Sequence, residues 1–101
     1  MIKILISALI ALGVWHNPVN ADIQYECGEV AVVTTQAIRL KNNGYNQDQA
    51  LTVIIEDAAE PEKAKAIVNK TFSANTNSYK NKSFDDIYKI SYKLCLAGIG
   101  P

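Results

Sequence analysis

The chain has 101 residues, 49% of them hydrophobic, and its ten basic and ten acidic side chains give a formal net charge of zero. This length leaves room for one domain at most, and the overall charge is balanced. With two cysteines, only one disulfide pairing is possible within the chain.

Residues 1–21 are typical of a cleavable secretory signal. Lys3 supplies the positive start, and residues 4–14 form an unbroken apolar run, long enough for a signal core but too short to span a bilayer. Pro18 then interrupts helix formation, and Ala21 is the small residue after which we expect cleavage. The alternative, an uncleaved anchor, needs about 20 apolar residues. We therefore expect a secreted single domain of residues 22–101, periplasmic in a Gram-negative source and not membrane-spanning in its mature form.

Cys27 and Cys95 lie near the two ends of this expected domain. Disulfides persist in secreted proteins, so we expect these two residues to pair; free buried thiols are the alternative. In the chain-entropy description, closing so long a loop stabilises the fold by roughly 4 kcal/mol. A domain this small needs such a cross-link, because its core alone contributes little net stability.

The only histidine, His16, lies in the expected leader, as do the only tryptophan and methionine. A mature domain without imidazole cannot carry out Ser-His or Cys-His catalysis, and it lacks the usual zinc ligands. Carboxylates remain, but Glu56-Asp57 and Asp85-Asp86 are sequence neighbours, which point about 100° apart on a helix. We expect no enzyme, no cofactor and no metal, and we keep a carboxylate-only hydrolase as a third possibility.

The first helix is predicted over residues 26–43. Apolar and small side chains recur there at intervals of three and four residues, at Cys27, Val30, Ala31, Thr34, Ala37 and Ile38. Val32, Val33 and Thr35 prefer strands and weaken the pattern. Gly44 is placed to end this helix in a left-handed conformation.

A second helix is predicted after Asn46, which can cap it with Gln49 in a capping box. Residues 53–55 could be read as a strand, but the surrounding polar spacing favours a helix. A third helix is predicted from Pro61, since proline is accepted in a first helical turn. The expected buried residues of these two helices are Ala50, Leu51, Ile54, Ile55, Ala58, Ala64, Ile67, Val68, Thr71 and Phe72.

Residues 73–82 have no helical period and predict the longest loop. Ser83 then caps a fourth helix, whose expected buried stripe is Phe84, Ile87, Tyr88, Ser91, Leu94 and Cys95. Both cysteines thus fall on inner helix faces. The predicted fold class is all-α, a compact bundle of about four short amphipathic helices closed by one disulfide.

The charges are divided between the two halves of the expected domain. Residues 22–62 hold eight acidic against two basic side chains, whereas residues 63–101 hold seven lysines against two aspartates. Attraction between two helical hairpins is the simplest interpretation. Glu56 and Asp57 fit it poorly, because they lie near the negative end of their predicted helix, where carboxylates are disfavoured. Local rules are often broken at functional sites, so we regard both as candidates for partner binding.

A second candidate surface lies in the loop, where Tyr79 is expected to be exposed beside Lys80 and Lys82. An exposed tyrosine flanked by lysines can anchor a protein partner, although an inert polar connection is the commoner explanation. One tyrosine with few cations does not predict nucleic-acid binding.

The packing and capping residues follow one another in the order Cys27, Ala37, Arg39, Gly44, Ile67, Val68, Ser83, Tyr92 and Cys95. This order resembles small uncharacterised helical periplasmic proteins of Gram-negative bacteria, over nearly the whole expected domain. The resemblance implies a fold and a compartment and no activity. In size, export and helical build the chain is also similar to envelope-located immunity proteins of toxin systems and to phage proteins that inhibit lysozymes, but no motif of either group is present.

These observations predict a non-enzymatic protein-binding domain, such as an inhibitor or immunity-type partner of an envelope enzyme or toxin. The expected partner is a protein of the cell envelope and not a nucleic acid, and the domain itself is expected to be a monomer or weak dimer. The alternative is an accessory or structural envelope protein without a dedicated target.

Overall fold

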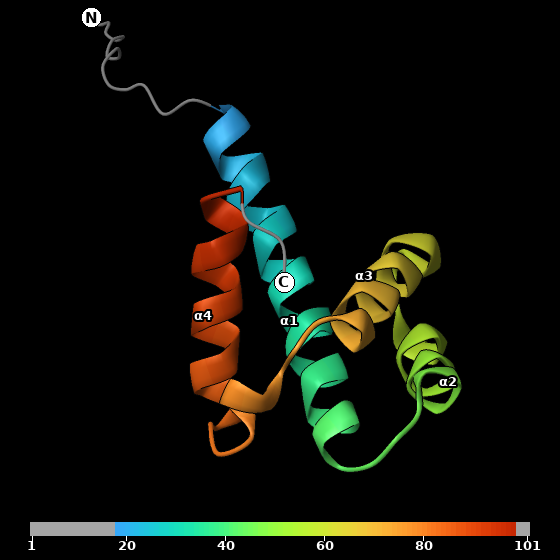
Figure 1. Ribbon diagram of the computed structural model, residues 1–101. Coiled ribbons are helices and arrows are strands. Elements are labelled where there is room, and N and C mark those ends of the chain that lie inside the picture. The colour runs from blue at the N-terminus through green and yellow to red at the C-terminus, as the bar shows by residue number, and fades with distance from the viewer. Residues whose placement is uncertain (1–17, 99–101) are drawn as a thin grey trace, which may run out of the picture.

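Helix α1, Pro18–Asn42, is the longest element and lies between the other helices (Figure 1). The computed structural model describes residues 18–98, and within this range the chain forms helices and no strands. After α1 come α2 (Gln47–Asp57), α3 (Pro61–Ser73), the short 3-10 helix η1 (Asn77–Tyr79) and α4 (Phe84–Leu96). The predicted all-α bundle of four helices is therefore confirmed.

Helix α1 begins earlier than the periodicity predicted. We expected its start at Glu26, but the helix already includes Pro18, which stands at its first residue. Proline is accepted in the first turn because the amide hydrogen that it lacks has no partner there. Ala21, after which we expect cleavage, is thus inside α1, and the remainder of the expected leader, residues 1–17, lies outside the described residues.

The predicted starts of the helices after α1 are confirmed, and α2 and α4 have the expected capping hydrogen bonds. The Asn46 side chain accepts a hydrogen bond from the Gln49 amide at 2.8 Å, and the Asn46 amide donates to the Gln49 side chain at 2.9 Å. Pro61 opens α3, and the Ser83 hydroxyl accepts from the Asp86 amide at 3.2 Å. Gly44 has a φ of 93°, a left-handed conformation that costs glycine little.

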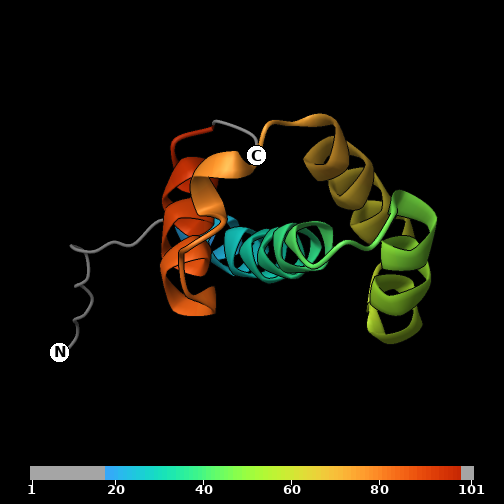
Figure 2. The ribbon, with the colours of Figure 1, turned by 60° about the horizontal axis from the view of Figure 1, so that its bottom comes forward.

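Helix α1 packs against its neighbours with two faces: α4 lies on one side of it and the α2–α3 hairpin on the other (Figures 1 and 2). The disulfide Cys27–Cys95 joins α1 to α4 with a Cα–Cα distance of 5.5 Å, as the sequence predicted. Ala31, Thr34 and Ile38 are buried and follow Cys27 at helical spacing, so they continue the face that α4 covers. On α4, Ile87 is fully buried.

The second face of α1 belongs to the core that it shares with α2 and α3. That core is built on Ala37, Ala50, Ile54, Ala64 and Val68, with half-buried Val33, Leu40, Leu51, Ala58 and Phe72 around them. Three of the five buried residues are alanines, which let the helix axes approach closely.

Polar contacts also connect α1, α2 and α3 to one another. The Lys41 ammonium donates hydrogen bonds to the carbonyls of Phe72 and Ala74, at 3.2 and 2.7 Å. The Gln47 amide group donates to the Asn69 side chain at 2.6 Å and so links α2 to α3. The two Lys41 bonds supply partners for carbonyls at the end of α3 that the helix itself leaves unpaired.

Thr35, whose strand preference weakened the pattern, lies in α1 as predicted, where it is fully buried and donates its hydroxyl to the Ala31 carbonyl at 2.6 Å. Two local predictions were wrong. Phe84, expected in the buried stripe of α4, remains 40% exposed because it is the first residue of a helix that packs mainly on α1. The predicted loop contains η1, and Tyr79 within it is half-buried and not exposed.

Candidate functional site

A half-open groove of about 680 Å³ lies between α1 and the α2–α3 hairpin. One wall is the stretch of α1 from Tyr25 to Gln36; the other comprises the end of α2, the turn after it and the first half of α3. The lining residues are Tyr25, Glu26, Glu29, Val30, Val32, Val33, Gln36, Ile54, Asp57, Ala58, Ala59, Glu60, Lys63, Ala64, Ala66 and Ile67. It is larger than the other hollow described below, which holds about 420 Å³.

The groove is mainly apolar. Val30, Val33 and Ile67 are half-buried, and Val32 is 38% exposed beside them. These side chains extend the apolar surface of α1 and α3 past the point where the two helices cover each other. An apolar concave surface with a few charged groups at its edge is a common form of binding site.

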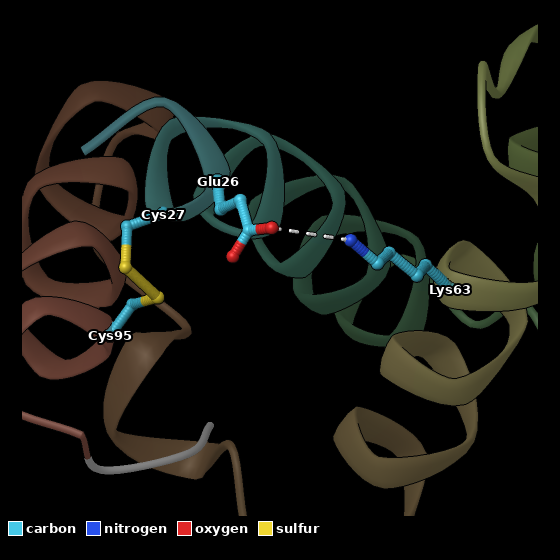
Figure 3. The surroundings of a disulfide bond; sticks show 4 residues. All are labelled: Glu26, Cys27, Lys63 and Cys95. Carbon is cyan, nitrogen blue, oxygen red and sulfur yellow. Dashed lines mark ion pairs between the residues drawn. A yellow bond between two sulfur atoms is a disulfide. The ribbon is translucent and has the colours of Figure 1, made fainter. Parts of the chain in front are cut away.

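Carboxylates stand on both walls, with Glu26 and Glu29 on α1 and Asp57 and Glu60 opposite. The one cation of the lining, Lys63, lies 3.3 Å from Glu60 and 3.7 Å from Glu26. Figure 3 shows the Lys63 side chain extending from α3 towards Glu26, while the adjacent Cys27 turns to Cys95 on α4. Glu26 and Cys27, consecutive residues of α1, therefore connect this helix to α3 by an ion pair and to α4 by the disulfide.

The charged side chains that line the groove give it a net negative charge. The pKa of Lys63 is raised above its ordinary value, by hydrogen bonding to Glu60 first and then by the charges of Glu60 and Glu26. Glu29 and Asp57 form no ion pair within residues 18–98. Two ion pairs join the oppositely charged halves in that range, both to Lys63: the contact with Glu60 lies within one helical turn, and the contact with Glu26 is the one ion pair between two helices.

The loop residues proposed from the sequence come together in a different place. Tyr79, Lys80 and Lys82 line a shallow hollow of about 420 Å³ with Arg39 of α1. The remaining lining residues, Asn42, Asn43, Asn81 and Ser83, are all polar. This hollow lies at the C-terminal end of α1, beyond the stretch that forms the groove.

Glu56 and Asp57, the other two residues that the sequence suggested for partner binding, do not both line the groove. Asp57, the last residue of α2, lines the groove, whereas Glu56 does not, and both side chains belong to exposed residues. Sequence reasoning missed the apolar lining, including Val30, Val32 and Ile67, because such residues at helical spacing normally form a core. The available signal was that Val32 and Val33 widen the apolar face of α1 beyond the stripe that one neighbouring helix covers.

The groove can bind through apolar contact and charge, and its lining side chains include no hydroxyl other than that of Tyr25 and no imidazole or thiol. Within residues 18–98, no group of three or more metal-ligating side chains is close enough together to hold an ion. None of the helices in that part of the chain is long and apolar enough to cross a membrane. Comparison of the chain with models of protein families, with curated proteins and with solved structures finds no match.

Proposed function

We propose that this chain is a secreted, non-enzymatic protein-binding domain of the inhibitor or immunity type, periplasmic in a Gram-negative source, which holds a protein of the cell envelope in the groove. The observation that carries the proposal is an apolar groove with carboxylates on both walls. Surfaces of this kind combine an apolar centre, which contributes most of the affinity, with a charged rim, which directs association.

Binding is favoured over hydrolysis by the setting of the carboxylates. A carboxyl group that acts as a general acid needs burial or a like charge to raise its pKa. The side chains of Glu26 and Glu60 are instead 65% and 67% exposed and share the Lys63 cation. The rim is thus suited to attract a cationic surface.

The groove is favoured over the Tyr79 hollow as the main interface. Interface centres are desolvated and enriched in apolar and aromatic groups. The hollow has Tyr79 alone as an apolar contributor, among charged and amide side chains. We keep Tyr79, Lys80 and Lys82 as the alternative surface.

The test is capture of envelope proteins by the mature domain and by two matched variants. Val32→Lys places a charge in the groove, and Val53→Lys makes the same change on α2 outside it, at 38% and 45% exposure. Both variants should remain folded, because lysine is a better helix former than valine. We expect the parent and Val53→Lys to retain the same partner and Val32→Lys to lose it by about 2 kcal/mol or more, the scale of an interface hot spot.

The captured protein then serves for an activity assay. If it is an enzyme or toxin, addition of the parent domain should abolish its activity, and addition of Val32→Lys should not. Undiminished capture by Val32→Lys would contradict the groove as the interface, and loss of capture by Tyr79→Ala alone would place the interface at the hollow. Full activity of the captured protein in the complex would contradict an inhibitor.

A further inference from the structure

The backbone of the groove walls limits what can occupy the groove. The α1 wall is helical throughout, and the other wall is helical except for the turn between α2 and α3, where the Ala58 amide donates to the Ile55 carbonyl and the Ala64 amide to the Glu60 carbonyl. No strand edge is therefore offered to an extended segment. A segment buried there must satisfy its own backbone groups, which an α-helix does and an isolated strand does not.

The lining residues of the groove then indicate which side chains such a helix needs. The floor presents Val30, Val33 and Ile67, so the occupant needs an apolar stripe at intervals of three and four residues. Because carboxylates flank this floor on both walls, the stripe must be bordered by lysine or arginine on both sides.

Lys63 already shows where a cation fits, since its ammonium lies between Glu26 and Glu60. Glu29 and Asp57, on opposite walls, form no ion pair within residues 18–98 and are available to cations of a bound partner. Asp57 also ends α2, where a carboxylate faces the negative end of the helix dipole and disfavours the helix slightly. A cationic partner would compensate for this local cost.

We infer that the groove binds a cationic amphipathic helix of the partner protein, an inference that rests on the proposed function. The α1 wall runs from Tyr25 to Gln36, about 17 Å at 1.5 Å per residue, so roughly three turns of a bound helix contact the groove. The bound helix would lie as an additional member of the bundle, on the surface of α1 that neither α4 nor the hairpin covers.

The experiment uses three synthetic peptides of about four turns and the folded parent chain. The first has leucine at every third and fourth position and lysine elsewhere, the second replaces the lysines by glutamate, and the third has the composition of the first without helical period. Binding is measured by fluorescence anisotropy at low and high salt. We expect the first peptide to bind at least about tenfold more tightly than either of the others, and its binding to weaken as salt rises.

Matched variants test whether the bound peptide is in the groove. Val32→Lys and the double variant Glu29→Gln, Asp57→Asn should each weaken binding of the first peptide by at least about tenfold, whereas Val53→Lys and Glu56→Gln should leave it unchanged. Glu56 is the neighbour of Asp57 outside the groove, so it controls for the loss of one charge. Circular dichroism and melting curves check that each variant is folded.

Equal binding of the lysine peptide and its unpatterned version, or equal weakening by Glu56→Gln, would overturn the inference, because charge alone would then explain the binding. A parent chain that is a dimer in solution and becomes a monomer on Val32→Lys substitution would overturn it too, since a second copy would occupy the groove. Groove-dependent capture of an envelope protein together with failure of the lysine peptide would leave the proposed function intact and refute only the helical cationic partner.

Discussion

Lys41 acts as a link between α1 and the end of α3. The residue is half-buried, and its ammonium donates to two carbonyls at 2.7 and 3.2 Å and lies 5.9 Å from the centre of the Phe72 ring. Lys41→Met keeps most of the apolar stem but leaves both carbonyls without this donor. We expect a loss of about 1.5 to 3 kcal/mol in the free energy of unfolding, the usual size for hydrogen bonds to a charged group. Urea denaturation measures it, with the exposed Lys65→Met as control; equal effects of the two changes would contradict the role of Lys41.

Two glycines should respond to alanine with opposite signs. Gly28 lies within α1, and a methyl group there would meet its nearest neighbour, the Tyr88 hydroxyl, at 3.6 Å, an ordinary contact. Gly28→Ala should therefore raise stability by about 0.5 to 1 kcal/mol, since glycine weakens a helix interior. Gly44→Ala should lower it by about 1 kcal/mol, because alanine is strained at a φ of 93°. A loss of stability in Gly28→Ala would show that α1 and α4 are closer than this geometry allows.

At the scale of elements, we expect the disulfide to contribute a large share of what holds α4 to α1. It packs mainly on α1, and it contributes no residue to the core cluster that α1 shares with α2 and α3. Its one fully buried large side chain is Ile87, whose burial is worth roughly 1.5 to 3 kcal/mol. The disulfide contributes an estimated 4 kcal/mol by restricting the unfolded chain, which is more than that burial.

Loss of the disulfide should consequently affect α4 first. Reduction, or Cys95→Ser, should lower the melting temperature by well over 10 °C, at roughly 4 to 8 °C per kcal/mol for a domain of this size. Hydrogen exchange should show amides of residues 84–96 losing nearly all protection, while those of α2 and α3 retain part of theirs. Uniform loss of protection in all helices would show that the two sides of α1 fold as one unit.

For the whole molecule, the groove follows from unequal helix lengths. Helix α1 has 25 residues, whereas α2 has 11 and α3 has 13, so α1 is about twice as long as either. The hairpin cannot cover the whole apolar face of α1, and Val30, Val32 and Val33 are left at the edge of the contact.

Export is a further property of the whole chain and stays a prediction. We expect the exported product to begin at Asp22, to lack tryptophan and to retain an α1 that starts before Cys27. Intact mass and N-terminal sequencing of the secreted protein decide it. Recovery of the uncut chain from the membrane fraction would contradict cleavage.

The amino-acid sequence alone sufficed for the features that depend on a few neighbouring residues. The Asn46–Gln49 capping box, Pro61 at the start of α3, Ser83 before α4 and the left-handed Gly44 were all predicted, because capping and backbone conformation are decided within one helical turn. The cysteine pairing was predicted as well, since two cysteines allow only one intramolecular bond.

The groove was decided only by the tertiary structure. A periodic pattern shows which side of a helix is apolar, but not how much of that side its neighbours cover, which depends on their lengths and crossing angles. Val32 and Val33 widened the apolar face of α1, but the pattern did not show that this extra width would line a groove, and Asp57 could not be separated from Glu56. The same reason explains Tyr79, whose polar sequence context indicated exposure, although it is half-buried at the end of η1 and lines a hollow with residues from the end of α1.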